Sequence, residues 1–164
     1  MLMHRFIYVA TLSMLCASAA YATELADRVI VVKSERKLYL MSSGKVLKEM
    51  PISLGLRPKG GKQKEGDFRT PEGEYLLDRR NNESRYFLSI QVSYPNTVDR
   101  LQAEKTGVRP GSHIMIHGHP NEPKHSRQYY SNVDWTDGCI AVSNADMVNV
   151  WRLTTLDTPI SIIP

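Results

Sequence analysis

Apolar and polar residues alternate in several short stretches of the chain, and a spacing of two residues is typical of half-buried strands. The clearest case is 88–93, with the sequence LSIQVS. Further short runs rich in Val, Ile, Leu and Tyr are bounded by turn residues, and we predict strands there as well. These runs are 27–33, 37–41, 46–54, 74–78, 113–117, 140–142 and 158–163.

Two segments carry helix signals instead. Asn96 is a good N-cap for a helix over 97–106, which Gly107 would end. Ser143 and Asp146 have the spacing of a capping box, which predicts a helix that runs to about Leu153. The sequence therefore predicts a mainly β fold with one or two helices, arranged as a β-sandwich or a barrel-like sheet.

Two polar segments separate these elements. The segment 56–66 is rich in Gly and Lys, and Thr70-Pro71-Glu72-Gly73 after it is a β-turn pattern. The basic residues of this region are Arg57, Lys59, Lys62, Lys64 and Arg69. We expect them to be solvated, or else to meet acidic groups of a ligand. The second segment, 118–136, is a long polar loop in which Tyr129 and Tyr130 either line a groove or fix the loop.

The N-terminus has the pattern of a secretory signal. Arg5 precedes an apolar run over 6–16, and Ala20-Tyr21-Ala22 has the A-x-A form of a cleavage site. A membrane anchor would need about 20 apolar residues. Lipid attachment at Cys16 is disfavoured because the bulky Leu15 precedes it. We therefore predict a signal peptide over 1–22, one domain over 23–164, and a periplasmic or otherwise exported protein with no integral membrane segment after cleavage.

Net charge excludes one class of partner. The chain has 21 Lys+Arg and 17 Asp+Glu, and losing Arg5 with the leader leaves a net charge of +3. A balance this mild does not indicate nucleic-acid binding, although it suits contact with an anionic polymer.

Cysteine usage points toward chemistry. Once Cys16 is removed, Cys139 is the only cysteine of the mature chain, so no disulfide partner exists within it. A buried thiol can serve simply as a small hydrophobe. In an oxidising compartment, however, a lone thiol is a liability, and its presence there favours a catalytic role.

A thiol needs a base, and the histidines provide one. His117 stands at the end of the strand predicted over 113–117, where its side chain would be held rigidly beside a cleft. Gly138, directly before Cys139, would allow a substrate carbonyl to approach and would leave backbone N–H groups free for an oxyanion. We therefore expect a Cys139 thiol of low pKa that is activated by His117. His113 is expected beside the site, and His119 and His125 as loop residues.

A metal site is the alternative interpretation of the same residues. His117 and His119 could share an ion with a third ligand from Cys139, Asp134 or Asp137. The sequence contains no C-x-x-C or H-E-x-x-H pattern, so we favour an enzyme without metal or other cofactor.

The motifs around these residues resemble a known family. Ile116-His117-Gly118, followed after a long loop by Thr136-Asp137-Gly138-Cys139-Ile140, is similar to the signature of the L,D-transpeptidase catalytic domain (YkuD) family. The resemblance extends over nearly all of 23–164 and includes the turn at 70–73, Asn144-Ala145-Asp146 and the closing Thr158-Pro159-Ile160.

The resemblance implies a function and a site. Family members attack peptidoglycan stem peptides with the cysteine and pass the resulting thioester to an amine or to water. By position, Cys139 is the nucleophile, His117 is the base, and the Gly118 carbonyl orients the imidazole. Thr136, Asp137 and Gly138 would shape the oxyanion site, with backbone N–H groups near Gly138 and Cys139 as donors.

Two departures from the family pattern leave the reaction type open. Asp137 stands where the family usually has histidine, and Ala141 where it often has arginine. Tyr94-Pro95-Asn96 and Thr136-Asp137-Gly138-Cys139 resemble a divergent branch with a member that releases a wall-linked lipoprotein. Hydrolysis is therefore the alternative to transfer, and a non-catalytic wall-binding module is the alternative of a different class.

Overall fold

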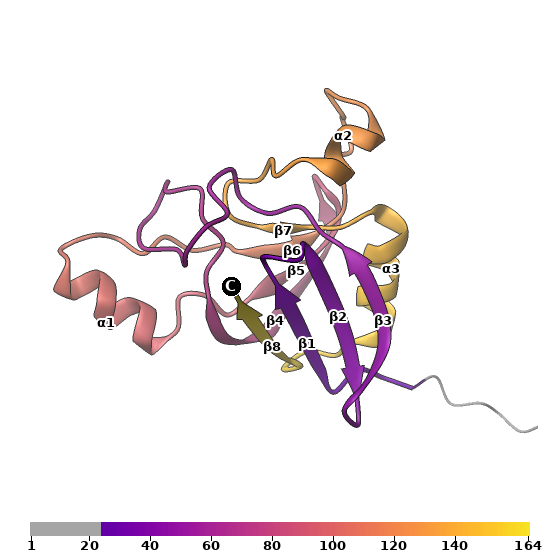
Figure 1. Ribbon diagram of the computed structural model, residues 1–164, viewed down its shortest axis with the longest axis horizontal. Helices are drawn as coiled ribbons and strands as arrows, with labels where there is room; N and C mark the ends of the chain where they lie inside the picture. Colours follow the sequence, from indigo (N-terminus) through magenta and orange to yellow (C-terminus); the bar gives the residue numbers. More distant parts are fainter. Residues whose placement is uncertain (1–23) are drawn as a thin grey trace, which may run out of the picture.

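The computed structural model describes residues 24–164, so the predicted signal peptide over 1–22 lies outside the described residues. This part of the chain forms eight strands and three short helices (Figure 1). The strands are β1 (Arg28–Val32), β2 (Lys37–Ser42), β3 (Lys45–Pro51), β4 (Gly73–Ser84), β5 (Phe87–Val92), β6 (Met115–His117), β7 (Ile140–Ala141) and β8 (Pro159–Ile163). The helices are α1 (Thr97–Lys105), α2 (Arg127–Asn132) and α3 (Asn144–Leu153).

The strands form one mixed sheet in the order β3-β2-β1-β8-β4-β5-β6-β7. Neighbouring strands are antiparallel except for the parallel pairs β1–β8 and β6–β7. The mainly β fold class is thereby confirmed. The prediction of one or two helices is wrong by one, because α2 lies inside the segment 118–136 that was expected to be a loop.

The two ends of this sheet are tied together. The N–H groups of Ser53 and Ala141 each donate to the other residue's carbonyl oxygen at 2.8 Å. Two further bonds join Leu54 and Leu56 to Thr136 at 3.1 and 3.0 Å. The segment after β3 therefore pairs with β7 and with the loop before it, which closes the sheet in the barrel-like manner that the sequence suggested.

Alternation along the strands fills the interior. In β1 and β2 the side chains of Val29, Val31, Leu38 and Leu40 are fully buried, while their neighbours face outward. Helix α3 covers one side of the sheet, whereas α1 projects from the body of the molecule (Figure 1). No helix within 24–164 has the length and apolar character required to span a membrane.

Both predicted helix caps are present. The Asn96 side chain accepts from the N–H groups of Val98 and Asp99, and the Asp99 carboxylate accepts from the Asn96 N–H, which makes a full capping box. At α3 the Ser143 hydroxyl accepts from the Asp146 N–H and donates to the Asp146 carboxylate. These local signals were readable because the interacting residues are three positions apart.

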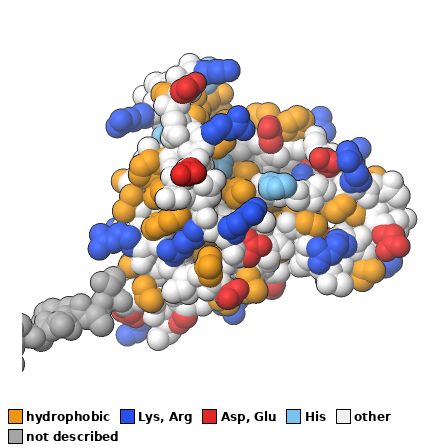
Figure 2. All heavy atoms as spheres, turned by 180° about the vertical axis from the view of Figure 1, so that it is seen from behind, with side chains coloured by type: hydrophobic (Ala, Val, Ile, Leu, Met, Phe, Trp, Pro, Cys, Tyr) orange, Lys and Arg blue, Asp and Glu red, His pale blue; other side chains and the backbone are white. Residues whose placement is uncertain are grey.

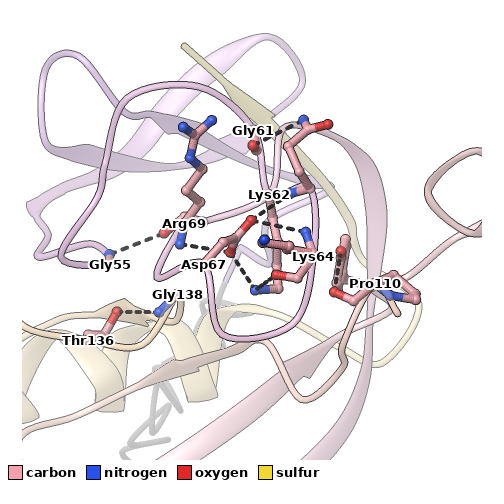
Figure 3. A network of polar contacts seen from close by, with 12 residues as sticks. Gly55, Gly61, Lys62, Lys64, Asp67, Arg69, Pro110, Thr136 and Gly138 are labelled. Atoms are coloured by element: carbon pink, nitrogen blue, oxygen red, sulfur yellow. Dashed lines mark hydrogen bonds and ion pairs between the residues drawn. The ribbon is translucent and has the colours of Figure 1, made fainter. Parts of the chain in front are cut away.

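The segment after β3 is only in part the solvated loop that was expected, since Arg57, Lys59 and Lys64 are exposed but Lys62 is not. Lys62 and Asp67 form an ion pair at 2.8 Å with side-chain exposures of only 4% and 8%. Asp67 also accepts from the N–H groups of Gln63, Lys64 and Arg69, and these bonds, together with Lys62, hold the pKa of its carboxyl at about 2 despite the opposing effect of burial. Figure 3 shows Asp67 at the centre of this network, and the adjoining Arg69 contacts Gly138 of the neighbouring loop through its carbonyl oxygen.

Candidate active site

His117 is the last residue of β6 and is almost fully buried. Its Nδ1 lies 2.7 Å from the carbonyl oxygen of Gly118. Because a carbonyl oxygen only accepts, Nδ1 carries the proton in this bond, and in the neutral ring the lone pair is on Nε2. The side chain is thereby held in the tautomer that a general base requires.

Aromatic rings surround this imidazole. The Tyr86 ring centroid lies 4.6 Å from that of His117, and the Trp135 ring meets it edge-on at 5.5 Å. Removal from water lowers the pKa of His117 to about 4, although the Gly118 carbonyl opposes this effect. His117 is therefore a neutral imidazole at neutral pH.

Cys139 directly precedes β7, the parallel neighbour of β6, in which Ile140 pairs with Ile116. Cys139 as a residue is half-buried, and its thiol donates to the carbonyl oxygen of His113 at 3.6 Å. Burial raises the pKa of the Cys139 thiol, and the Asp137 carboxylate adds to this, while the Met115 backbone and Lys62 act in the opposite direction. The low thiol pKa expected from the sequence is therefore wrong for the unliganded site.

The His113 backbone is unusual at this point. The prediction of a strand from residue 113 is wrong, because His113 has φ 61° and β6 starts only at Met115. A positive φ is uncommon outside glycine and is often found at functional sites. In this conformation the His113 carbonyl oxygen accepts from the Cys139 thiol. The His113 ring does not contact the thiol in this way and forms a hydrogen bond with the Ser112 hydroxyl at 2.6 Å.

One cavity of about 430 Å³ brings together Cys139 and His117. Its wall is formed by the end of β4, the β4–β5 turn and β5, by the residues before and in β6, and by the loop before β7. The other residues that line it are Asn81, Glu83, Ser84, Arg85, Tyr86, Ser89, His113, Met115, Trp135, Thr136 and Asp137. The predicted nucleophile, the predicted base and two of the four predicted orienting residues thus share one space.

Thr136 organises the loop that carries the cysteine. Its hydroxyl donates to the Cys139 carbonyl oxygen at 2.7 Å and accepts from the Gly138 N–H at 3.1 Å. The expectation that the Gly138 N–H is free for an oxyanion is therefore wrong for this structure. The Cys139 N–H has no hydrogen-bond partner within the described part of the chain, which leaves it as the candidate donor.

Close packing explains the two glycines of the site. Gly138 has φ 129°, and a Cβ built there would lie 2.6 Å from the Arg69 carbonyl oxygen. At Gly118 a Cβ would lie 2.6 Å from Oδ1 of Asn144. The same Asn144 oxygen accepts from the His119 N–H at 2.8 Å. Both glycines are therefore needed where the two functional loops touch their neighbours.

Sequence reasoning missed an anchor of the cysteine loop. The Asp134 carboxylate binds the Arg36 guanidinium through both oxygens, at distances down to 2.7 Å, and accepts from the Leu54 N–H at 2.9 Å. Arg36 comes from the β1–β2 turn, about 100 positions away in sequence. No local signal links residues this distant.

The alternative of a metal site is not supported by the placement of its candidate ligands. Asp134 is engaged by Arg36, and His119 packs against the Tyr130 ring at 5.6 Å. Within residues 24–164 no three His, Cys, Asp or Glu side chains gather in a way that would suit a metal ion.

Comparison with known proteins identifies the family. A model of the L,D-transpeptidase catalytic domain (YkuD) matches residues 26–162. The putative L,D-transpeptidase YafK of Escherichia coli K12 is 36% identical over 91 residues, which cover 54% of this chain and 32% of that protein. The chain therefore corresponds to about a third of the length of this curated relative.

Solved structures agree. The helical cell shape determining protein Pgp2 of Campylobacter jejuni superposes with a TM-score of 0.63 at 27% identity, over 82% of this chain and 46% of that one. An L,D-transpeptidase from Mycobacterium smegmatis shares the fold, with a TM-score of 0.56 at 15% identity over 84% of this chain and 58% of that one. The chain belongs to the L,D-transpeptidase catalytic domain (YkuD) family.

Proposed function

We propose that this protein is an exported cysteine enzyme of the L,D-transpeptidase type that acts on peptidoglycan stem peptides through a thioester on Cys139. The observation that carries the proposal is the shared cavity of Cys139 and His117 in a chain of this family. A wall-binding module without turnover has no need for a thiol and an imidazole fixed in one cavity.

The protonation states suggest how the first step proceeds. In the resting site both groups are neutral, since burial raises the pKa of Cys139 and lowers that of His117. Nε2 of His117 therefore takes the thiol proton as sulfur attacks the substrate carbonyl, rather than in an earlier equilibrium. The Cys139 N–H donates to the oxyanion, and the imidazolium then protonates the leaving amine as the C–N bond breaks.

The second step removes the acyl group. An incoming amine attacks the thioester, His117 takes its proton, and the returning proton regenerates the thiol. If water takes the place of the amine, the same steps give hydrolysis. We propose transfer as the reaction, and hydrolysis, including release of a wall-linked lipoprotein, as the alternative that Asp137 and Ala141 suggest.

The test is intact-protein mass spectrometry after incubation with purified wall fragments. Wild type is expected to show an acyl adduct on Cys139 and to give new amide products when an acceptor amine is present. Cys139→Ala is expected to show neither, and EDTA to leave turnover unchanged. Turnover that persists in Cys139→Ala, or that chelation abolishes and zinc restores, would refute the mechanism.

The exported location is tested separately. The leader pattern predicts a mature N-terminus at Thr23, directly after Ala22. Sequencing the N-terminus of protein recovered from the periplasm checks this, and a mature chain that begins elsewhere or carries lipid on Cys16 would contradict it.

A further inference from the structure

A second cavity adjoins the one that holds Cys139. It has a volume of about 550 Å³, and Arg85, Tyr86 and Trp135 line both cavities. The Tyr86 and Trp135 rings lie 6.0 Å apart on this shared wall. The two cavities are therefore neighbours on either side of this wall, and the cavity of about 550 Å³ is called the second arm below.

Aromatic rings form much of the second arm. Tyr130 is buried and meets Trp135 at 5.0 Å and Tyr129 at 5.5 Å between ring centroids. His125 stacks on Tyr129 at 4.1 Å with an interplanar angle of 31°. These contacts order the rings before any ligand arrives, so little conformational entropy is lost on binding.

Polar groups at the same arm lack protein partners. Within residues 24–164, no hydrogen bond or ion pair engages the side-chain polar groups of six lining residues. They are Arg85, Tyr86, Glu122, Lys124, His125 and Tyr129. The set contains donors, acceptors and both signs of charge, so it does not select a simple anion or cation.

The lining also argues against an extended peptide as the occupant. Peptides that bind in extended form commonly pair with the main chain of a strand edge. None of the residues that line this arm belongs to a strand: they come from the β4–β5 turn, the segment before α2, α2 itself and Trp135. A pyranose ring fits better, because its C–H faces pack on aromatic rings while its hydroxyls need both donors and acceptors.

We propose that the second arm binds a sugar of the glycan strand that carries the stem peptide. This inference rests on the proposed function, since it places the peptide at Cys139 and its saccharide in the adjoining arm. It makes Tyr129 a specificity-determining residue that is remote from the reacting atoms.

The test compares two substrates that differ only in the sugar. One is a synthetic stem peptide, and the other is the same peptide on its N-acetylglucosamine–N-acetylmuramic acid disaccharide. Wild type is expected to have a KM about tenfold lower for the disaccharide form with similar kcat, which corresponds to about 1.4 kcal/mol. Tyr129→Ala is expected to lose this difference and to leave the KM for the free peptide unchanged.

Two further variants sharpen the comparison. Tyr129→Phe keeps the ring and is expected to keep most of the preference. Tyr39→Ala removes a similarly half-buried tyrosine from β2, away from both cavities, and is expected to behave as wild type. Equal losses for both substrates in Tyr129→Ala, or no preference in wild type, would overturn the inference.

A binding measurement separates this inference from the proposed function. The peptide-free disaccharide is titrated into Cys139→Ala and into the Cys139→Ala/Tyr129→Ala double variant, with binding followed by two-dimensional NMR. The first is expected to bind, and the second to bind at least about tenfold more weakly. Absence of binding to Cys139→Ala overturns the inference even if the stem peptide is turned over. Binding without any turnover by wild type overturns only the proposed function.

Discussion

Burial determines the protonation states of Cys139 and His117. The imidazole packs against the rings of Tyr86 and Trp135, its Nδ1 donates to the Gly118 carbonyl oxygen, and the thiol contacts the His113 carbonyl. A thiolate–imidazolium pair would place two charges in a site that disfavours both. The free enzyme therefore holds a neutral pair, and charge develops only when substrate is present.

The first prediction concerns the thiol and its base. The rate of alkylation of the free enzyme by iodoacetamide is expected to rise with pH through an inflection above that of an ordinary cysteine, because burial raises the pKa of Cys139. His117→Ala is expected to leave this inflection nearly in place but to lower turnover by about 10²–10⁴-fold. His119→Ala is the matched control, and a large loss there with none in His117→Ala would assign the base to His119.

The second prediction concerns stability against pH. His117 has a pKa of about 4 in the folded protein and an ordinary value of 6.5, so the unfolded chain binds its proton first as the pH falls. Folding stability is therefore complete above pH 6.5, and roughly 3 kcal/mol of it is lost on going down to pH 4. Urea unfolding of wild type and His117→Gln at several pH values measures the difference, and parallel curves would contradict it.

At the scale of elements, two distant segments hold the cysteine loop in place. The Arg36–Asp134 ion pair fixes its start, and the Lys62–Asp67 network sits against Gly138 through the Arg69 carbonyl (Figure 3). Neither the ion pair nor the network contacts the thiol. Both are needed because the loop has no regular secondary structure between α2 and β7.

The third prediction tests the first of these anchors. Asp134→Ala removes the partner of Arg36 and leaves the Leu54 N–H unsatisfied, which is expected to cost about 2–3 kcal/mol. Turnover is expected to fall as well, because Trp135 and Thr136 follow directly. Thermal unfolding and turnover are compared with Asp78→Ala, an exposed acidic residue of β4 that forms no ion pair within 24–164. Equal behaviour of the two variants would refute the anchor.

Local chemistry explains which elements were predictable. The caps at Asn96 and Ser143 and the alternating strand predicted over 88–93 were read correctly, since their signals lie within a few residues. The predicted strand bounds were wrong elsewhere, because β4 continues to Ser84 beyond the predicted end at 78 and β3 already ends at Pro51. Helix α2 was not predicted, because no apolar stripe follows its N-cap, Ser126. The buried Lys62–Asp67 pair was missed, because charge in a Gly- and Lys-rich segment ordinarily indicates solvation.

At the scale of the whole molecule, closure of the sheet brings the site together. The strand that ends at His117 and the strand that follows Cys139 are adjacent, but the loop before β7 is positioned by the segment after β3, far earlier in the chain. The sequence could supply both residues by resemblance, yet not this pairing, because strand order depends on contacts between distant residues.

The basic side chains on the face in Figure 2 are separate from one another and form no continuous basic stripe, in agreement with the mild net charge.

The fourth prediction tests the closure directly. The amide protons of Ser53 and Ala141 are expected to exchange with solvent as slowly as that of Ile116 in the buried strand β6. The reason is that each of the two N–H groups donates to the other residue's carbonyl oxygen at 2.8 Å, across the seam between β7 and the segment after β3. Hydrogen exchange followed by NMR measures this. Exchange at the rate of an unstructured peptide at either residue would show that the seam opens and that the cysteine loop lacks this support.

The protonated state of Cys139 has a consequence for its chemical survival. The thiolate attacks peroxides and alkylating reagents far faster than the thiol does, and its first product with a peroxide is a sulfenic acid. Since burial raises the pKa of Cys139, few molecules carry a thiolate at neutral pH. A nucleophile that is activated only by the arrival of its substrate is thereby protected, between turnovers, from the oxidants of the compartment in which the protein is proposed to work.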